Sequence, residues 1–241
     1  AFAELASVLC PGYAVAAIED EEFLLPFKFF RMQPATLHLS ATAQPAGAGE
    51  LLVNAVLRSV IQPKPELPVQ ERVHFRARVR MSRQAPSRPL MAFEPPPREG
   101  LSIGADTVYR VYFHGPAYRV IERAGVAGET AISLLAVGLR PNAVPVSADS
   151  VTAPRLLELC FQTAGLWLLA TKEVMALPAG LRRAVFYPQP EPADVRRLYA
   201  VVTAVGQGAE FDARVVDEDG NVYLELSGYR TVSLPGRKVL G

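Results

Sequence analysis

The chain has 241 residues, of which 50% are apolar and 20% are charged, and this balance excludes an intrinsically disordered protein. The formal net charge is only +1, so the overall charge does not direct the chain to nucleic acid or to a membrane surface. The longest apolar run, residues 156–170, is interrupted by Glu158 and Gln162 and is shorter than the ~20 residues of a membrane span. We therefore expect a globular protein with neither a nucleic-acid partner nor a membrane partner.

The first half opens with AFAELASVLC, which reads as the middle of an apolar helix without a capping residue. We therefore expect residue 1 to be an internal point of a longer polypeptide. The two cysteines, Cys10 and Cys160, lie in apolar surroundings and form no CxxC pair. They are typical of buried thiols in a reducing compartment, which favours the cytoplasm.

Three further elements follow in the first half: LLPFKFF at 24–30, LHLSATAQPAGAGELLVNAVLRSV from 37, and VHFRARVRM at 73–81. The last of these alternates, with Val73 and Phe75 on one face and His74 and Arg76 on the other, which predicts a half-solvated antiparallel strand. By the same alternation His38 and His74 are expected to lie in solvent. Residues 84–105 then carry five prolines and are expected to link the two halves.

The second half repeats this order of elements. It has an apolar helix, LELCFQTAGLWLLA, then ALPAGLRRAVFY at 176–187, then strands from 198 onward joined by a DEDGN turn at 217–221. Thr42 recurs 161 positions later as Thr203, and Glu50 recurs 160 positions later as Glu210. A helix laid on a curved antiparallel sheet, present twice, predicts an α+β protein of two units, residues 1–83 (truncated at its N-terminus) and residues 106–241.

Two motifs of the second half resemble a known family. HGPAY at 114–118 resembles the YGPxF-type motif of the dehydratase domains of polyketide synthases and polyunsaturated fatty-acid synthases, and PRLLELCFQ at 154–162 is similar to the P-x-LLD-x-x-x-Q helix of those domains. The resemblance implies a double hotdog fold. It also implies dehydration of 3-hydroxyacyl thioesters bound to an acyl carrier protein, within a synthase of several domains. No cofactor of its own is implied, because phosphopantetheine arrives on the carrier protein.

The chain departs from the family pattern at two points. Glu158 stands where the family usually has Asp, although the stand-alone fatty-acid dehydratases use Glu in a similar E-x-x-x-Q helix. The family's catalytic histidine belongs to an H-x-x-x-G-x-x-x-x-P motif, which none of the three histidines matches. The resemblance places that motif ahead of the first helix, so we expect it upstream of Ala1.

Dehydration needs a base for the C2 proton and an acid for the leaving C3 hydroxyl. Glu158, Gln162 and Gly165 follow helical i, i+4, i+7 spacing and share one face. Apolar neighbours favour the acid role because desolvation raises the pKa of a carboxyl group. We therefore predict Glu158 as the catalytic acid and Gln162 as its orienting partner. The alternative is that Glu158 sits in the first helical turn and only complements the helix dipole.

The HGPAY motif supplies the predicted substrate-binding residues. His114 and Tyr118 flank Gly115 and Pro116 where a strand is expected to start, and the resemblance places this motif at the mouth of an acyl tunnel. Tyr112 or Tyr118 is a candidate hydroxyl donor. A purely structural role for His114 stays open. Three scattered histidines and two apolar cysteines predict no metal site.

Arginines gather in one short segment, as Arg72, Arg76, Arg78, Arg80 and Arg83. They indicate either a charged edge strand that resists aggregation or a dock for an acidic acyl carrier protein, through Arg76, Arg78 and Arg80. Glu4, which holds the place of Glu158 in the first helix, is expected to be a non-catalytic relic of the repeat. Two other functions stay open at this stage, an acyl-binding or structural hotdog domain without catalysis, and a hotdog thioesterase.

Overall fold

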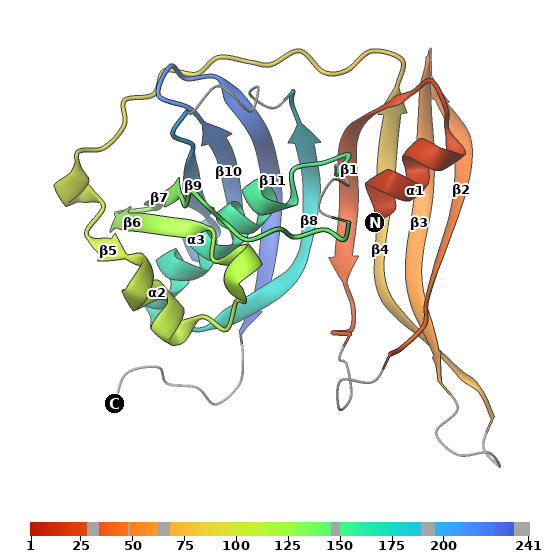
Figure 1. Cartoon of the computed structure of the whole chain (residues 1–241), viewed down its shortest axis with the longest axis horizontal. Coiled ribbons are helices and arrows are strands. Elements are labelled where there is room, and N and C mark those ends of the chain that lie inside the picture. The colour runs from red at the N-terminus through yellow and green to blue at the C-terminus, as the bar shows by residue number, and fades with distance from the viewer. Residues whose placement is uncertain (28–33, 48, 62–67, 146–149, 189–195, 234–241) are drawn as a thin grey trace.

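The structure is a computed structural model, and it describes the whole chain except residues 28–33, 48, 62–67, 146–149, 189–195 and 234–241. The described residues form one antiparallel sheet of 11 strands, in the order β2-β3-β4-β1-β8-β11-β10-β9-β7-β6-β5. Figure 1 shows the sheet curving around two helices, one in each half. This is the α+β arrangement that the alternating segments predict.

The first half comprises α1 (Phe2–Leu9), β1 (Ala14–Phe23), β2 (Leu37–Gly47), β3 (Glu50–Ile61) and β4 (Gln70–Ser82). The second half begins with β5 (Ile103–Gly104), α2 (Ala105–Val111), β6 (Ile121–Ala127) and β7 (Thr130–Leu135). It continues with α3 (Pro154–Lys172), β8 (Ala176–Phe186), β9 (Tyr199–Val205), β10 (Glu210–Val216) and β11 (Val222–Ser233). Among the described helices, none is long and apolar enough to cross a membrane.

The predicted repeat is visible in the sheet order. Reading outward from the centre, β1-β4-β3-β2 on one side matches β8-β11-β10-β9 on the other. The two halves join where β1 and β8 pair antiparallel, with Ile18 opposite Ala184. Glu50 is the first residue of β3 and Glu210 is the first residue of β10. The two glutamates, 160 residues apart, therefore begin equivalent strands of the two halves. The second half adds β7, β6 and β5 beyond β9.

The counterpart of β8 in the first half is β1, not the segment LLPFKFF that the sequence suggested. Residues 24–27 lie outside the strands, and the rest of that segment lies outside the described residues. The strand β1 is hard to recognise from its sequence, because four consecutive acidic residues, Glu19 to Glu22, interrupt the alternation of apolar and polar residues. The run is stabilised by arginines of the neighbouring strands, as in the bond from Arg80 to Glu19 at 2.8 Å, and such pairing cannot be read from β1 alone.

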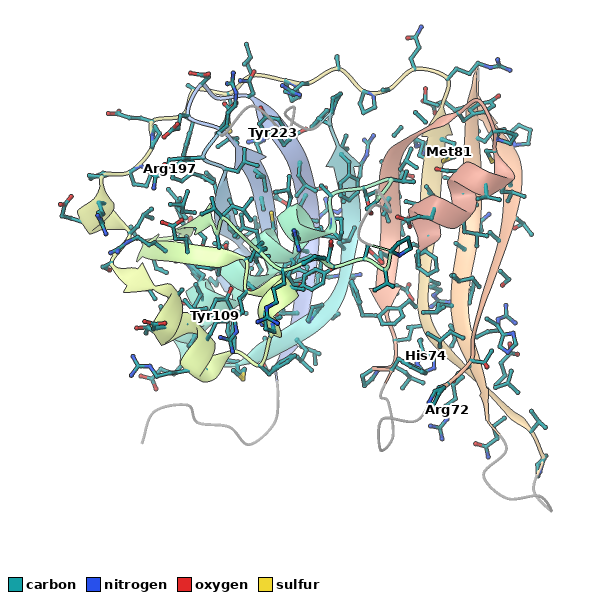
Figure 2. The ribbon with its side chains drawn as sticks, viewed as in Figure 1. Arg72, His74, Met81, Tyr109, Arg197 and Tyr223 are labelled. Atoms are coloured by element: carbon teal, nitrogen blue, oxygen red, sulfur yellow. The ribbon has the colours of Figure 1, made fainter. Side chains whose placement is uncertain are left out.

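The prediction of a solvated His74 is wrong, whereas His38 is exposed as expected. Leu57 pairs with Phe75 and Arg58 with Val73, so His74 is the extra residue of a β-bulge in β4. The bulge turns its side chain inward, where only 4% of the residue is exposed. Its Nδ1 lies 3.1 Å from the carbonyl oxygen of Leu25 and its Nε2 lies 2.8 Å from Ser59 Oγ. Figure 2 shows His74 near one end of this strand.

The proline-rich segment runs from β4 to β5 across one end of the second-half strands, by the turn between β10 and β11 (Figure 1). The Met91 amide donates to the Gly220 carbonyl at 2.9 Å, and the Val222 amide donates to the Pro89 carbonyl at 3.1 Å. The Phe93 ring lies 5.5 Å from the Tyr199 ring. Proline has no amide hydrogen to give, so the amide donor comes from Met91, whereas Pro89 takes part through its carbonyl oxygen.

Helix α3 is the centre of the second-half core. It packs against β6, β7, β8, β9, β10 and β11, and Leu159, Cys160 and Ala164 are fully buried. Cys10 is buried as well, so both cysteines are free, buried thiols as predicted. Burial raises the pKa of both thiols, which keeps them protonated and unreactive.

Candidate active site

Glu158 lies in the second turn of α3, which begins at Pro154 and has no acidic residue in its first turn. The interpretation of Glu158 as a first-turn residue that only complements the helix dipole is therefore wrong. The side chain is 23% exposed, which leaves it accessible from a pocket while its neighbours Leu156 and Leu159 are buried. The helix thus presents one carboxyl group at the edge of an apolar core.

Gln162, one turn further along α3, fixes the orientation of this carboxyl group. Its Nε2 donates to Glu158 Oε1 at 2.9 Å and to the Tyr118 carbonyl at 2.9 Å. Its Oε1 accepts a hydrogen bond from the Tyr109 hydroxyl at 2.9 Å. The Tyr118 carbonyl can only accept, so the amide nitrogen must face it and the Gln162 oxygen faces the Tyr109 hydroxyl, which also accepts from the Ile121 amide at 2.8 Å. The amide is therefore held with its nitrogen toward Glu158.

His114 meets the same carboxyl group from the HGPAY loop. Its Nε2 lies 2.9 Å from Glu158 Oε1, while Nδ1 is buried with no hydrogen-bond partner. The ring stacks on Phe113 at 4.9 Å, with 13° between the planes. No strand starts at His114: Pro116–Tyr118 form a 3-10 turn, and β6 begins only at Ile121.

Two arginines hold this loop in place through its backbone carbonyls. Arg119 Nε donates to the His114 carbonyl at 3.2 Å, and Arg155 Nε donates to the Ala117 carbonyl at 3.2 Å. The Arg119 guanidinium also lies 5.4 Å from the centre of the Tyr109 ring. The position of His114 over α3 is thus determined by several contacts.

Tyr112 lies directly beneath the pocket and donates its hydroxyl proton to the Gln162 carbonyl at 2.9 Å. Burial raises the pKa of Tyr112, and it raises the pKa of Tyr109 to about 12, so both phenols remain donors at neutral pH. Sequence reasoning missed Tyr109 and all of α2. The only sequence signal for a helix here was the i, i+3 spacing of Tyr109 and Tyr112. The surrounding Thr, Val and Tyr residues favour a strand instead.

Two adjoining pockets, of about 200 Å³ and about 460 Å³, share Phe113, His114, Glu158 and Phe161 in their walls. Tyr112 and Gln162 line the smaller one, and Gly115 and Tyr118 line the larger one. Pro116 lines neither of them. The other predicted site residues are therefore brought together.

The site lies where the two halves meet. Phe161 stacks on Tyr229 of β11 at 4.3 Å. The ring of Phe23, from β1 of the first half, meets the edge of Phe161 at 6.1 Å. An apolar wall built from both halves therefore stands one turn away from the Glu158 carboxyl group.

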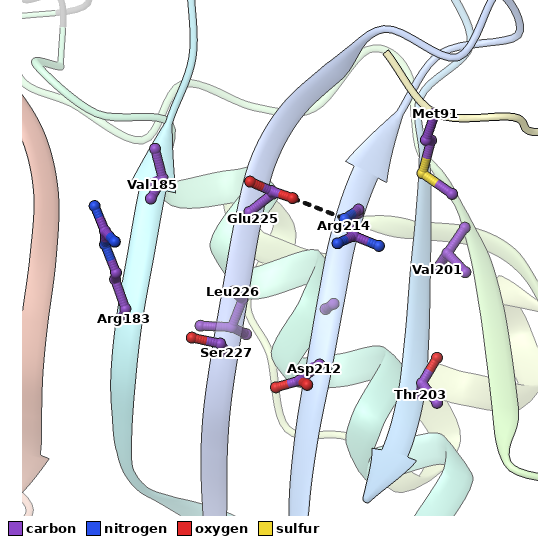
Figure 3. Close-up of a pocket in the computed structure, with 11 residues that line it drawn as sticks. Met91, Arg183, Val185, Val201, Thr203, Asp212, Arg214, Glu225, Leu226 and Ser227 are labelled. Atoms are coloured by element: carbon purple, nitrogen blue, oxygen red, sulfur yellow. Dashed lines mark hydrogen bonds and ion pairs between the residues drawn. The ribbon is translucent and has the colours of Figure 1, made fainter. Parts of the chain in front are cut away.

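A separate pocket of about 460 Å³ lies on the outer face of the second-half sheet, on the opposite side from α3 (Figure 3). Its charged side chains are already engaged: Arg214 donates to Glu225 at 2.8 Å, and Asp212 accepts from the Gly228 amide at 2.9 Å. No acid and base converge there, so we do not assign chemistry to it.

The arginines that suggested a docking surface are paired with carboxylates. Arg76 binds Glu22 at 2.6 Å, Arg78 binds Asp20, and Arg80 binds both Glu19 and Glu50 at 2.8 Å. Strand β4 is also an interior strand, between β3 and β1, so the expectation of a charged edge strand is wrong. These ion pairs offset the positive charge of the arginines, and a carrier dock at Arg76, Arg78 and Arg80 stays a prediction. Glu4 bonds with Ser150 at 3.1 Å and lies in neither pocket of the site.

Two helix-on-sheet units that share one sheet, with a polar cluster at their junction, define a double hotdog protein. The family model described as "Polyketide synthase dehydratase N-terminal domain" matches residues 94–240, which include the HGPAY loop, α3 and β8 to β11. The chain belongs to the polyketide synthase dehydratase family. Its activity is of the hydro-lyase type, the dehydration of hydroxyacyl intermediates bound to a carrier protein within such a synthase.

Solved structures agree with this fold. The dehydratase domain from the CurF module of curacin polyketide synthase matches with a TM-score of 0.71 and 17% identity, over 96% of this chain and 80% of that one. The CurK dehydratase domain matches with a TM-score of 0.70 and 15% identity, over 97% and 82%. A trans-AT dehydratase domain from Brevibacillus brevis matches with a TM-score of 0.69 and 17% identity, over 96% and 82%. No curated protein matches the chain.

Proposed function

We propose that this domain converts 3-hydroxyacyl thioesters to 2-enoyl thioesters, with Glu158 as the acid that protonates the leaving hydroxyl group. The observation that carries the proposal is the arrangement around the Glu158 carboxyl group. Its Oε1 accepts from Gln162 and lies 2.9 Å from His114 Nε2, whereas Oε2 has no hydrogen bond to any described residue. One oxygen is thus held by the protein and the other is available to a substrate.

The chemistry follows from this placement. A base removes the proton at C2, the C3–O bond breaks, and the proton of the Glu158 carboxyl group completes the water molecule. Phe161, Leu177 and Tyr229 line the smaller pocket, so an acyl chain can lie along hydrocarbon while its C3 hydroxyl faces the carboxyl group. The thioester arrives on the phosphopantetheine of an acyl carrier protein, which requires no cofactor resident in the domain.

None of the three histidines suits the role of base in this arrangement. His38 is exposed on β2, which is far along the sheet from α3 in Figure 1. His74 has contacts at both ring nitrogens, and His114 has Nε2 on Glu158 and Nδ1 buried. We therefore propose that the base is a histidine outside these 241 residues, in the family's H-x-x-x-G-x-x-x-x-P motif.

The test is a dehydration assay that follows enoyl formation from a 3-hydroxyacyl carrier-protein thioester. It uses this chain and a polypeptide extended upstream by about half a domain. The proposal is supported if the extended polypeptide is active, if Glu158→Gln abolishes this activity, and if Glu4→Gln retains it. Glu4 is the matched control because it is the corresponding acid of α1. Full activity in Glu158→Gln would refute the assignment.

The same assay separates the two alternative functions. Release of a free acid from a saturated acyl thioester would identify a thioesterase. Binding of the acyl carrier-protein thioester without any turnover in the extended polypeptide would identify a domain that only binds acyl chains.

A further inference from the structure

We infer that His114 is a neutral positioning residue, which donates its Nε2 proton to Glu158 Oε1 and thereby directs the acid's own proton to Oε2. The contact of 2.9 Å between Nε2 and Oε1 and the buried, unpartnered Nδ1 carry this inference. Its structural part stands alone, whereas its catalytic consequence rests on the proposed function.

The environment of Nδ1 decides the protonation state of the ring. A neutral imidazole with its proton on Nε2 leaves only a lone pair at Nδ1. An imidazolium would bury an N–H donor without an acceptor, and a buried unsatisfied donor is costly.

Other titratable groups surround the pair on each packed element. From α2 and the segment after it come Tyr109 and Tyr112, from α3 comes Cys160, and from β11 comes Tyr229. All four have a raised pKa, with burial as the first cause. They are neutral around pH 7, so among these neighbours the Glu158 carboxyl group is the acidic group that lies against the His114 ring.

The consequence for Glu158 is geometric. A carboxyl oxygen has two lone-pair directions. At Oε1 Gln162 occupies one of them, and the inferred Nε2 proton of His114, whose nitrogen lies 2.9 Å away, occupies the other. A proton on the carboxyl group must then reside on Oε2, the oxygen without a protein partner. His114 and Gln162 together therefore present the acidic proton to the pocket.

His74 supplies an internal control with the opposite tautomer. Its Nδ1 faces the Leu25 carbonyl at 3.1 Å, and a carbonyl only accepts, so Nδ1 carries the proton. Its Nε2 then accepts from the Ser59 hydroxyl at 2.8 Å. His38 is exposed and provides the reference for a ring free to exchange between tautomers.

The first experiment is a nitrogen-15 NMR spectrum of the histidine rings of this chain at pH 7, with each ring assigned by substitution. The expected result is a protonated Nε2 and a bare Nδ1 for His114, with the reverse pattern for His74. In Glu158→Leu the His114 signals should move toward the averaged pattern of His38, while those of His74 stay in place. The inference is overturned if His114 is doubly protonated or carries its proton on Nδ1. It is also overturned if the His114 signals do not change in Glu158→Leu.

The second experiment measures dehydration kinetics in the extended polypeptide. His114→Gln keeps an N–H donor near the position of Nε2, and His114→Phe keeps the stacked ring without a donor. We expect His114→Phe to lower kcat by about 10- to 100-fold, the usual effect of losing a hydrogen bond to an ionisable group, and His114→Gln to recover most of it. Equal kcat in both variants overturns the positioning role. If the wild type has no activity while the tautomers are as inferred, the proposed function fails and the structural inference stands.

Discussion

Gly165 lies so close to Tyr112 that a Cβ atom built on the glycine would stand 2.5 Å from the tyrosine hydroxyl oxygen. Gly165 occupies the third position of the i, i+4, i+7 face that begins at Glu158, and it lines the smaller pocket. A glycine inside a helix costs about 1 kcal/mol relative to alanine. This close approach explains why the helix carries one here.

The first prediction concerns Gly165→Ala. In the wild-type background we expect a loss of about 1–3 kcal/mol in the free energy of unfolding, the usual cost of overpacking. In the Tyr112→Phe background the clashing oxygen is absent and the next contact is 3.5 Å from the Cβ. The same substitution should there be neutral or stabilising by up to about 1 kcal/mol. Urea unfolding of the four proteins gives the coupling energy, and additive effects would contradict the argument.

The second prediction concerns Tyr109→Phe. The variant lacks the hydroxyl that binds Gln162 Oε1 and accepts from the Ile121 amide, so two polar groups lose their partner. We expect a loss of about 1–3 kcal/mol in stability and a lower kcat, because the Gln162 amide is then free to turn. The matched control is Tyr118→Phe, whose hydroxyl has only a 3.4 Å contact with Asn142. Equal stability of the two variants would contradict this account.

The sequence predicted the Glu158–Gln162 hydrogen bond because helical spacing alone places the two side chains together, and it predicted the duplicated unit from its offsets. It could not predict Tyr109 as a partner of Gln162, because α2 is short and rich in residues that favour strands. Its helical form goes with tertiary contacts, to β5 and β6 and through its tyrosine hydrogen bond to α3. The bulge at His74 was hidden as well, because a bulge is defined by the register of the partner strand and not by the bulged strand itself.

The third prediction concerns the predicted DEDGN turn, which joins β10 to β11 as expected. Asp217 is 1% exposed, and Asn221, Tyr223 and Arg196 all donate to it. Asp217→Asn replaces one acceptor oxygen by a donor, and we expect a loss of about 3–5 kcal/mol, as for breaking a buried charged pair. Asp219→Asn is the control, because that side chain is 71% exposed and its ion pair with Arg196 is a surface pair, whose loss should cost less than about 1 kcal/mol. Thermal unfolding that fails to distinguish the two variants would contradict the role of Asp217.

The fourth prediction concerns Glu21, at the junction of β1 and β8, where it lies opposite Leu181. Burial raises the pKa of the Glu21 carboxyl group to about 7, from its ordinary value of 4.5. Because the folded-state pKa lies above the unfolded one, the neutral acid's contribution to stability is fully present below about pH 4.5. It is lost progressively as the pH rises toward and through 7.

Replacement by glutamine removes this titration. We therefore expect Glu21→Gln to gain stability relative to the wild type as the pH rises from 5 to 8. The control is Glu22→Gln, because Glu22 is already paired with Arg76 at 2.6 Å and should give no such gain. Urea midpoints across this pH range are the measurement. A Glu21→Gln difference that is constant with pH would show that Glu21 is solvated as a carboxylate in the folded protein.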